Sequence, residues 1–170
     1  MQEYSDQELL DQFSKQETRN YSFNLLIRKY QQKLYWHIRR MVIDHDDADD
    51  VIQNTFIKVW NGLDKFNGES QLYTWLYRIA TNESLTFLKQ KKLRAGVSLD
   101  SVEYGLANGL TDDNYFSGDE IQKKLQNAIL TLPEKQRLVF NMKYYEEMKY
   151  DEMSEVLGTS VGALKASYHH

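Results

Sequence analysis

The chain has 170 residues with 25 acidic and 21 basic side chains, a net charge of −4 that is unusual for an autonomous DNA-binding protein. It contains no cysteine, which excludes disulfides, thiol catalysis and cysteine metal sites. It shows neither a signal peptide nor an apolar run of about 18 residues, so we expect a cytoplasmic protein.

The pattern of apolar residues favours an all-α fold. No stretch sustains the alternation of apolar and polar residues that a strand requires, and the chain contains a single proline. Its length is sufficient for two helical domains of roughly 50–100 residues each.

The N-terminal part predicts two helices. Ser5 and Glu8 form a capping-box pattern before a short helix. In the longer helix that follows, apolar residues recur three or four positions apart and predict a buried stripe. Beside it we expect an exposed basic face, made of Arg28, Lys29, Lys33, Arg39 and Arg40.

Acidic residues dominate positions 44–50, where the next helix should begin with Asp46 or Asp47 as its cap. A calcium loop starting at Asp44 would need glycine and glutamate where Asp49 and Thr55 stand, so we expect no metal site. His37 and His45 have no nucleophile or acid in a triad pattern, and we expect both to lie on the surface. The sequence therefore predicts no catalytic residue and no cofactor.

A loop around Asn67 and Gly68 precedes a long helix expected from Gln71 to about Leu93. Trp75 continues the inward stripe of this helix and is more typical of packing than of base stacking. Single-stranded DNA binds aromatic rings and hydrogen-bond donors in a positively charged groove. The helix offers such groups at Tyr73, Arg78, Asn82, Lys89 and Lys92.

Residues 95–118 contain four glycines and few large apolar side chains, which predicts a flexible linker. Helical spacing resumes near Asp119, and Pro133 suits the first turn of a further helix. A short helix at 150–157 should end at Gly158, and Ser160 should cap the last helix, in which Tyr168 and His169 point outward. This pattern is typical of a helix-turn-helix, although a plain three-helix bundle would show the same periodicity.

Three motifs between Phe23 and Lys92 carry a closer resemblance. They are DDADDVIQNTFIKVW at 46–60, FNGES at 66–70 and TWLYRIATN at 74–82. Together they resemble region two of the extracytoplasmic-function sigma factors of the sigma-70 family, the small promoter-recognition subunits of bacterial RNA polymerase. The helix-turn-helix that follows is similar to region four of that family.

The resemblance implies two small helical domains joined by a flexible linker, with region two at 1–94, the linker at 95–118 and region four at 119–170. It implies an alternative sigma factor that binds core RNA polymerase, directs it to specific promoters and assists their opening, without being an enzyme. An anti-sigma factor is a further partner that the resemblance allows. An autonomous helix-turn-helix regulator and a helical adaptor protein remain the alternatives.

The resemblance also implies roles for individual residues. Core-polymerase binding falls on the helix with Asp47, Asp50, Gln53, Asn54 and Ile57. Binding of the minus-ten element falls on the loop, with Phe66, Asn67, Gly68 and Ser70, and on the five residues of the long helix named above. Binding of the minus-thirty-five element falls on Ser160, Gly162, Lys165, Ala166 and His169. Members of the family usually carry arginine where Ser167 stands, and the chain ends at His170, so we expect a shortened, weakly binding recognition helix.

Overall fold

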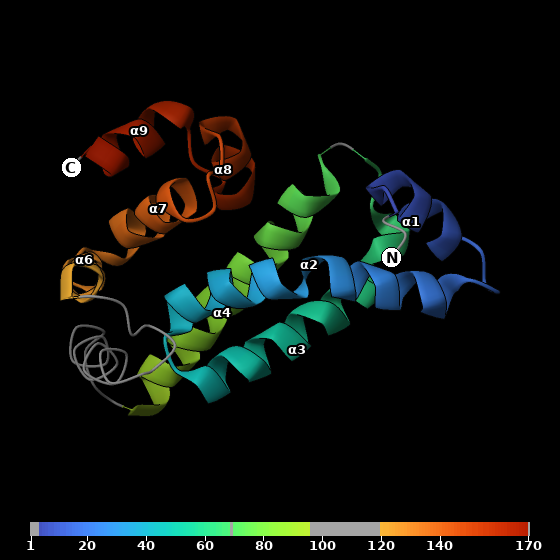
Figure 1. Ribbon diagram of the computed structural model, residues 1–170, viewed down its shortest axis with the longest axis horizontal. Coiled ribbons are helices and arrows are strands. Elements are labelled where there is room, and N and C mark those ends of the chain that lie inside the picture. The colour runs from blue at the N-terminus through green and yellow to red at the C-terminus, as the bar shows by residue number, and fades with distance from the viewer. Residues whose placement is uncertain (1–3, 69, 96–119, 170) are drawn as a thin grey trace.

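A computed structural model describes residues 4–68, 70–95 and 120–169 (Figure 1). Apart from Ala95, the predicted linker lies outside these residues. Within them every regular element is a helix, as predicted. The elements are α1 (Asp6–Phe13), α2 (Arg19–Val42), α3 (His45–Gly62), the 3-10 turn η1 (Leu63–Lys65), α4 (Leu72–Ala95), α6 (Glu120–Leu130), α7 (Glu134–Tyr144), α8 (Tyr150–Leu157) and α9 (Val161–His169).

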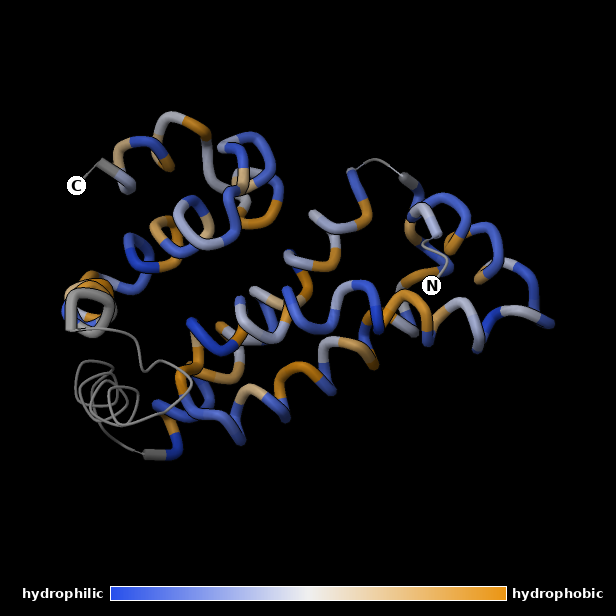
Figure 2. Tube along the Cα trace, viewed as in Figure 1, coloured by the Kyte–Doolittle hydropathy of each residue, from blue (hydrophilic) through white to orange (hydrophobic). Residues whose placement is uncertain are grey.

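The first four helices form one bundle, in which α2, α3 and α4 pack against one another and α1 packs on α2. Leu34, Ile38 and Leu76 are completely buried between them. Figure 2 shows the hydrophobic positions recurring along these helices, as expected for helices that bury one stripe.

The C-terminal helices form a second, smaller unit, in which α9 packs on both α7 and α8. Val139, Met142, Met153 and Leu164 are among its fully buried side chains. This unit lies against α2 and α4, on the side away from α3 (Figure 1). The buried apolar residues of the two units form one continuous cluster.

Local signals placed most helix ends correctly. The Ser5 hydroxyl accepts a hydrogen bond from the N–H of Glu8 at 3.2 Å, and the Ser160 hydroxyl accepts one from Ala163 at 3.3 Å. Gly158 ends α8 with a φ of +66°, a left-handed conformation that costs glycine little. Pro133 precedes α7 as its N-cap instead of occupying its first turn.

The prediction that Asp46 or Asp47 caps α3 is wrong. The cap is Asp44, whose carboxylate accepts a hydrogen bond from the N–H of Asp47 at 3.0 Å. Ile43 ends α2 with a φ of +73°, so the chain turns sharply and Asp44 already has the extended backbone that a cap requires. A β-branched residue in this conformation is strained.

Arg39 is buried, contrary to the prediction that it belongs to an exposed basic face. Its Nε donates to the carbonyl oxygen of Ile43 at 2.6 Å, and its guanidinium lies 3.4 Å from the hydroxyl of Tyr35. These hydrogen bonds compensate the loss of hydration and hold the strained turn.

His37 is also buried, contrary to the prediction of a surface position. Its Nε2 lies 2.8 Å from the hydroxyl of Thr81 on α4, and its ring lies 5.0 Å from that of Tyr77. Burial, reinforced by the charge of Arg40, lowers the pKa of His37 to about 3. The imidazole is therefore neutral at pH 7 and serves as a packing residue between α2 and α4.

Candidate functional site

The structure places four of the five predicted polymerase-binding residues on one exposed face of α3. Asp50, Gln53, Asn54 and Ile57 follow one another at the spacing of three and four residues that shares a helix face. Ile57 is 58% exposed, which is high for a large apolar side chain. Asp47 differs, because it is half-buried and forms an ion pair with Lys91 of α4 at 2.5 Å.

A groove of about 280 Å³ runs beside this face, between α3 and α4. The ion pair between Lys58 and Glu83 joins the two helices there. The residues that line the groove are Val51, Asn54, Lys58, Glu83, Thr86, Phe87 and Gln90. Only Asn54 among them was a predicted site residue, since the others become neighbours through packing of the two helices.

The loop after η1 forms one wall of a depression of about 290 Å³. Phe66 packs on Trp75 with 5.2 Å between ring centroids, and Gly68 has a φ of +78°. The opposite wall comes from α1, which sequence reasoning did not connect with this loop. The lining residues are Gln7, Leu10, Phe13, Ser14, Leu63, Asp64, Phe66, Asn67 and Gly68.

Arg19 ties the start of α2 to the segment just before this loop. Its guanidinium lies over the rings of Phe13, at 4.3 Å, and Trp60, at 5.1 Å, and forms an ion pair with Asp64. The two ring contacts and the ion pair hold both walls of the depression in place.

The predicted DNA-binding residues of α4 divide between two faces. Arg78, Asn82 and Lys89 are exposed and lie on one face by their spacing, and Lys92 is exposed further along. Tyr73 lies on another face, half-buried, with its ring 5.8 Å from that of Tyr77. Ser70, ahead of the helix, is half-buried.

Two short helices, α8 and α9, are joined by the three residues Gly158–Ser160, the arrangement of a helix-turn-helix. Ser160, Gly162, Lys165 and Ala166 are exposed at the start of α9. His169 is the last residue of α9, and its side chain lies outside the described residues. Tyr168 does not point outward as predicted, because its ring stacks on that of Phe140 at 6.0 Å.

Among the described residues, one group of side chains has the spacing of metal ligands, namely His45, Asp46 and Asp49. His45 Nδ1 lies 3.6 Å from a carboxylate oxygen of Asp46 and 3.4 Å from one of Asp49. All three belong to the first turns of α3, where carboxylates favour the positive end of the helix dipole. Their helical position explains this cluster without an ion.

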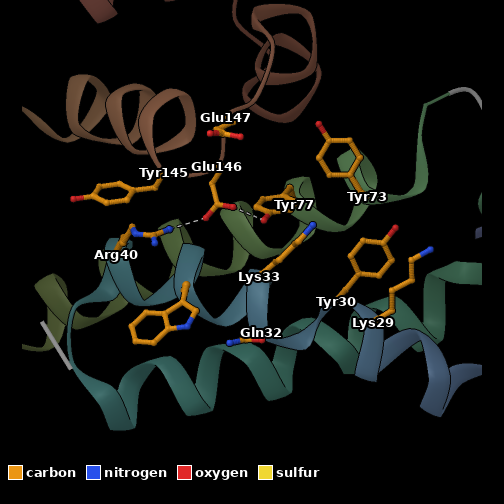
Figure 3. A pocket seen from close by; sticks show the side chains of 11 residues that line it. Lys29, Tyr30, Gln32, Lys33, Arg40, Tyr73, Tyr77, Tyr145, Glu146 and Glu147 are labelled. Carbon is orange, nitrogen blue, oxygen red and sulfur yellow. Dashed lines mark hydrogen bonds and ion pairs between the residues drawn. The ribbon is translucent and has the colours of Figure 1, made fainter. Parts of the chain in front are cut away.

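The two helical units meet at a polar contact that sequence reasoning missed (Figure 3). Glu146, in the turn between α7 and α8, accepts from the guanidinium of Arg40 at 2.7 Å and from the hydroxyl of Tyr77 at 2.6 Å. Burial, followed by the charge of Glu146, raises the pKa of Tyr77. The ring of Tyr145 covers the Arg40 guanidinium at 4.2 Å, and burial raises the pKa of its hydroxyl.

The described helices therefore define a two-unit protein that combines a helix-turn-helix with an exposed helix face and a surface depression beside the loop after η1. No helix among them is long and apolar enough to cross a membrane. The family pattern described as Sigma-70 region 2 matches residues 26–94, and that described as Sigma-70, region 4 matches residues 122–170.

Curated relatives extend the match over nearly the whole chain. The RNA polymerase sigma-H factor of Pseudomonas aeruginosa is 31% identical over 95% of this chain and 86% of its own length. The ECF RNA polymerase sigma-E factor of Escherichia coli K12 is 30% identical over 97% of this chain and 89% of its own length.

Two solved structures share the fold. CnrH in complex with the cytosolic domain of CnrY matches with a TM-score of 0.67 and 22% identity, over 96% of this chain and 90% of that one. The sigma factor RpoE of Bartonella quintana, in complex with the anti-sigma factor NepR, matches with a TM-score of 0.66 and 19% identity, over 86% and 89%.

The chain belongs to the extracytoplasmic-function sigma factors of the sigma-70 family. It is an alternative sigma factor that directs RNA polymerase to promoters, and it is not an enzyme. The predicted fold class and function are confirmed.

Proposed function

We propose that this sigma factor binds core polymerase mainly through the exposed face of α3, with Asp50, Gln53, Asn54 and Ile57 in contact. The observation that supports this is an exposed isoleucine among unburied polar side chains on one helix face. The C-terminal helices pack on the opposite side of the bundle, so this face stays accessible in the free protein. Asp47 contributes less to polymerase binding, because its ion pair with Lys91 already neutralises its charge.

Replacement of Asp50 by lysine should weaken binding to core polymerase without unfolding the protein. Exposed helix positions seldom change the free energy of unfolding by more than about 0.5 kcal/mol. Asp11→Lys on α1 is the matched control, since Asp11 is an exposed helical aspartate that does not belong to the proposed α3 face. Equal pull-down of core polymerase by both variants would contradict the assignment.

We infer that the depression beside the loop 66–70 takes a base unstacked from the minus-ten element and thereby assists promoter opening. Phe66, Asn67, Gly68 and Ser70 belong to the loop. The exposed stripe of Arg78, Asn82 and Lys89, with Lys92, offers donors and positive charge to the adjoining strand. Tyr73 has its ring on another face, so its contact to this strand is the weakest of the proposed set.

The test uses holoenzyme on a promoter that the wild-type protein selects from genomic DNA. Asn67→Ala should reduce permanganate reactivity of the minus-ten thymines, which reports strand opening, with little effect on core binding. Gln31→Ala, at an exposed position of α2 away from the depression, serves as the control. Unchanged opening by Asn67→Ala would argue against a base-binding loop.

We propose that α9 contacts the minus-thirty-five element. In this proposal the N–H groups of Ser160 and Gly162 bind phosphate, and Lys165, Ala166 and His169 read base edges. A net charge of −4 makes binding by the free protein weak, and specificity then depends on the polymerase. A nanomolar shift of promoter DNA by the free protein at about 0.15 M salt would contradict this proposal.

We further propose that the protein acts in the cytoplasm as two domains, 1–94 and 119–170, joined by a linker at 95–118. An anti-sigma factor is a proposed partner, because the two solved structures described above are each complexes of the matching chain with a second protein, which in one of them is an anti-sigma factor. The fraction of this protein that purifies from cells free of core polymerase should then contain one further protein in a stoichiometric complex.

A further inference from the structure

A cavity of about 660 Å³ lies between the two helical units, and its two sides carry opposite charges (Figure 3). Its lining cations, Lys29, Lys33 and Arg40, all belong to α2. Its lining acids, Glu146 and Glu147, both belong to the turn between α7 and α8. The face of the N-terminal bundle is thus cationic in itself, and the C-terminal unit supplies the negative charge.

Aromatic side chains accompany these cations. Tyr30, Trp36, Tyr73 and Tyr77 line the cavity from α2 and α4. Lys29 is engaged by Asp6 at 2.6 Å, whereas Lys33 is exposed and forms no ion pair among the described residues. Positive charge beside aromatic rings is the combination that binds the phosphates and bases of a single strand.

Glu146 is largely enclosed where it meets this face. Its side chain is only 10% exposed and that of Arg40 only 21%. The two carboxylate oxygens bind separate donors, the Arg40 guanidinium and the Tyr77 hydroxyl. A phosphodiester offers two non-bridging oxygens that could engage the same two donors.

The turn that presents Glu146 is strained and well anchored. Glu147 has a φ of +52°, which is uncommon for a residue with a side chain. The N–H of Glu146 donates to the carbonyl oxygen of Asn141 at 3.3 Å, and the N–H of Met148 donates to the carbonyl oxygen of Met142 at 3.0 Å. The packing of α7 therefore fixes the backbone that carries the carboxylate.

We propose that Glu146 occupies a phosphate-binding position, so that the α7–α8 turn competes with single-stranded nucleic acid for the face formed by Lys33, Arg40, Tyr73 and Tyr77. The face binds a strand once the C-terminal unit has moved away. This interaction is distinct from the base-binding loop and does not depend on it.

Fluorescence anisotropy of the full chain with a labelled single-stranded DNA of about 12 nucleotides tests the competition. Glu146→Gln keeps the shape of the side chain and removes its charge. The variant should bind the DNA about tenfold tighter than the wild type, because the charge-assisted hydrogen bond to Arg40 no longer holds the C-terminal unit against the N-terminal bundle. Glu155→Gln, at an exposed position on α8, removes the same charge elsewhere and should change the affinity less than about twofold.

Tyr77→Phe removes one of the two hydrogen bonds without altering the net charge, and it should give a smaller gain in the same direction. Lys33→Gln added to Glu146→Gln should abolish the gain. Phe66→Ala added to Glu146→Gln should retain it, which separates this face from the loop.

The proposal is overturned if Glu146→Gln binds the strand no more tightly than Glu155→Gln, or if Lys33→Gln leaves the gain intact. It is also overturned if Glu146→Gln binds a labelled acidic peptide of equal length as tightly as it binds the DNA. That result would identify the face as a protein-binding surface.

Discussion

Acidification below about pH 6.5 should destabilise this protein through His37. The side chain is 1% exposed, and burial lowers its pKa to about 3, whereas an unfolded chain gives histidine a pKa of about 6.5. Above pH 6.5 both states leave the imidazole neutral. Between pH 6.5 and 3 the unfolded state binds a proton that the folded state excludes, so stability falls as the pH falls.

The size of this effect follows from the two pKa values. Between pH 6.5 and pH 3 each pH unit of acidification lowers the free energy of unfolding by about 1.4 kcal/mol, and this dependence begins gradually near pH 6.5. Between pH 7 and pH 5 the free energy of unfolding should therefore fall by about 2 kcal/mol on account of His37.

Urea unfolding followed by circular dichroism at several pH values measures this loss. His37→Gln removes the ionisable group and retains a polar atom for Thr81, so it provides the comparison. The variant should be less stable than the wild type at pH 7 and should lose about 2 kcal/mol less on acidification to pH 5. Parallel stability curves for the two proteins over this range would refute a buried neutral His37.

Four further substitutions test local features of the fold. Gly158→Ala should lower the free energy of unfolding by about 1 kcal/mol, because alanine is strained at a φ of +66° even though its Cβ would meet no atom. Gly162→Ala, inside α9 and also without steric contact, should instead raise it by about 0.5 kcal/mol, and equal effects of the two would contradict the strain argument. Tyr30→Phe should cost about 1 kcal/mol by removing the hydrogen bonds of its hydroxyl to Asp6, which lie at 2.8 Å, and an unchanged urea midpoint would show that they contribute nothing. Leu164→Ala should cost about 2–5 kcal/mol, since this side chain is fully buried among α7, α8 and α9, and a loss below 1 kcal/mol would mean that the C-terminal unit is loosely packed.

The helices and their caps follow from the sequence where the signal is local. Ser5, Gly158 and Ser160 each act on backbone groups within three or four residues, so their effect can be predicted without tertiary structure. At α3 several neighbouring aspartates are suitable caps, and the backbone of Ile43 decides among them. That backbone depends in turn on the buried Arg39, which no periodic pattern reveals.

Polar residues on buried faces explain the other errors. His37 and Arg39 were assigned to the surface by their polarity, yet each is buried with a hydrogen-bond partner, Thr81 and the Ile43 carbonyl respectively. Packing supplies such partners, so polarity alone does not determine exposure.

The residues of the candidate site were also predictable only where the signal lies within one helix. Exposed stripes on α3 and α4 follow from spacing alone, since residues three and four apart share a face. The α1 wall of the loop depression and the contact of Arg40 with Glu146 join segments distant in sequence, and the latter pair is 106 residues apart. No pattern within one helix can predict either contact.

This separation also sets an order of events during synthesis. At the usual rate of about 5–20 residues per second, Glu146 is made roughly 5–20 s after Arg40. Closing a loop of this length costs about 4 kcal/mol of chain entropy, so the contact forms only after both units have folded. The N-terminal bundle of a nascent chain thus spends seconds on the ribosome with its cationic face uncovered, close to the polyanionic ribosomal surface and to translating RNA.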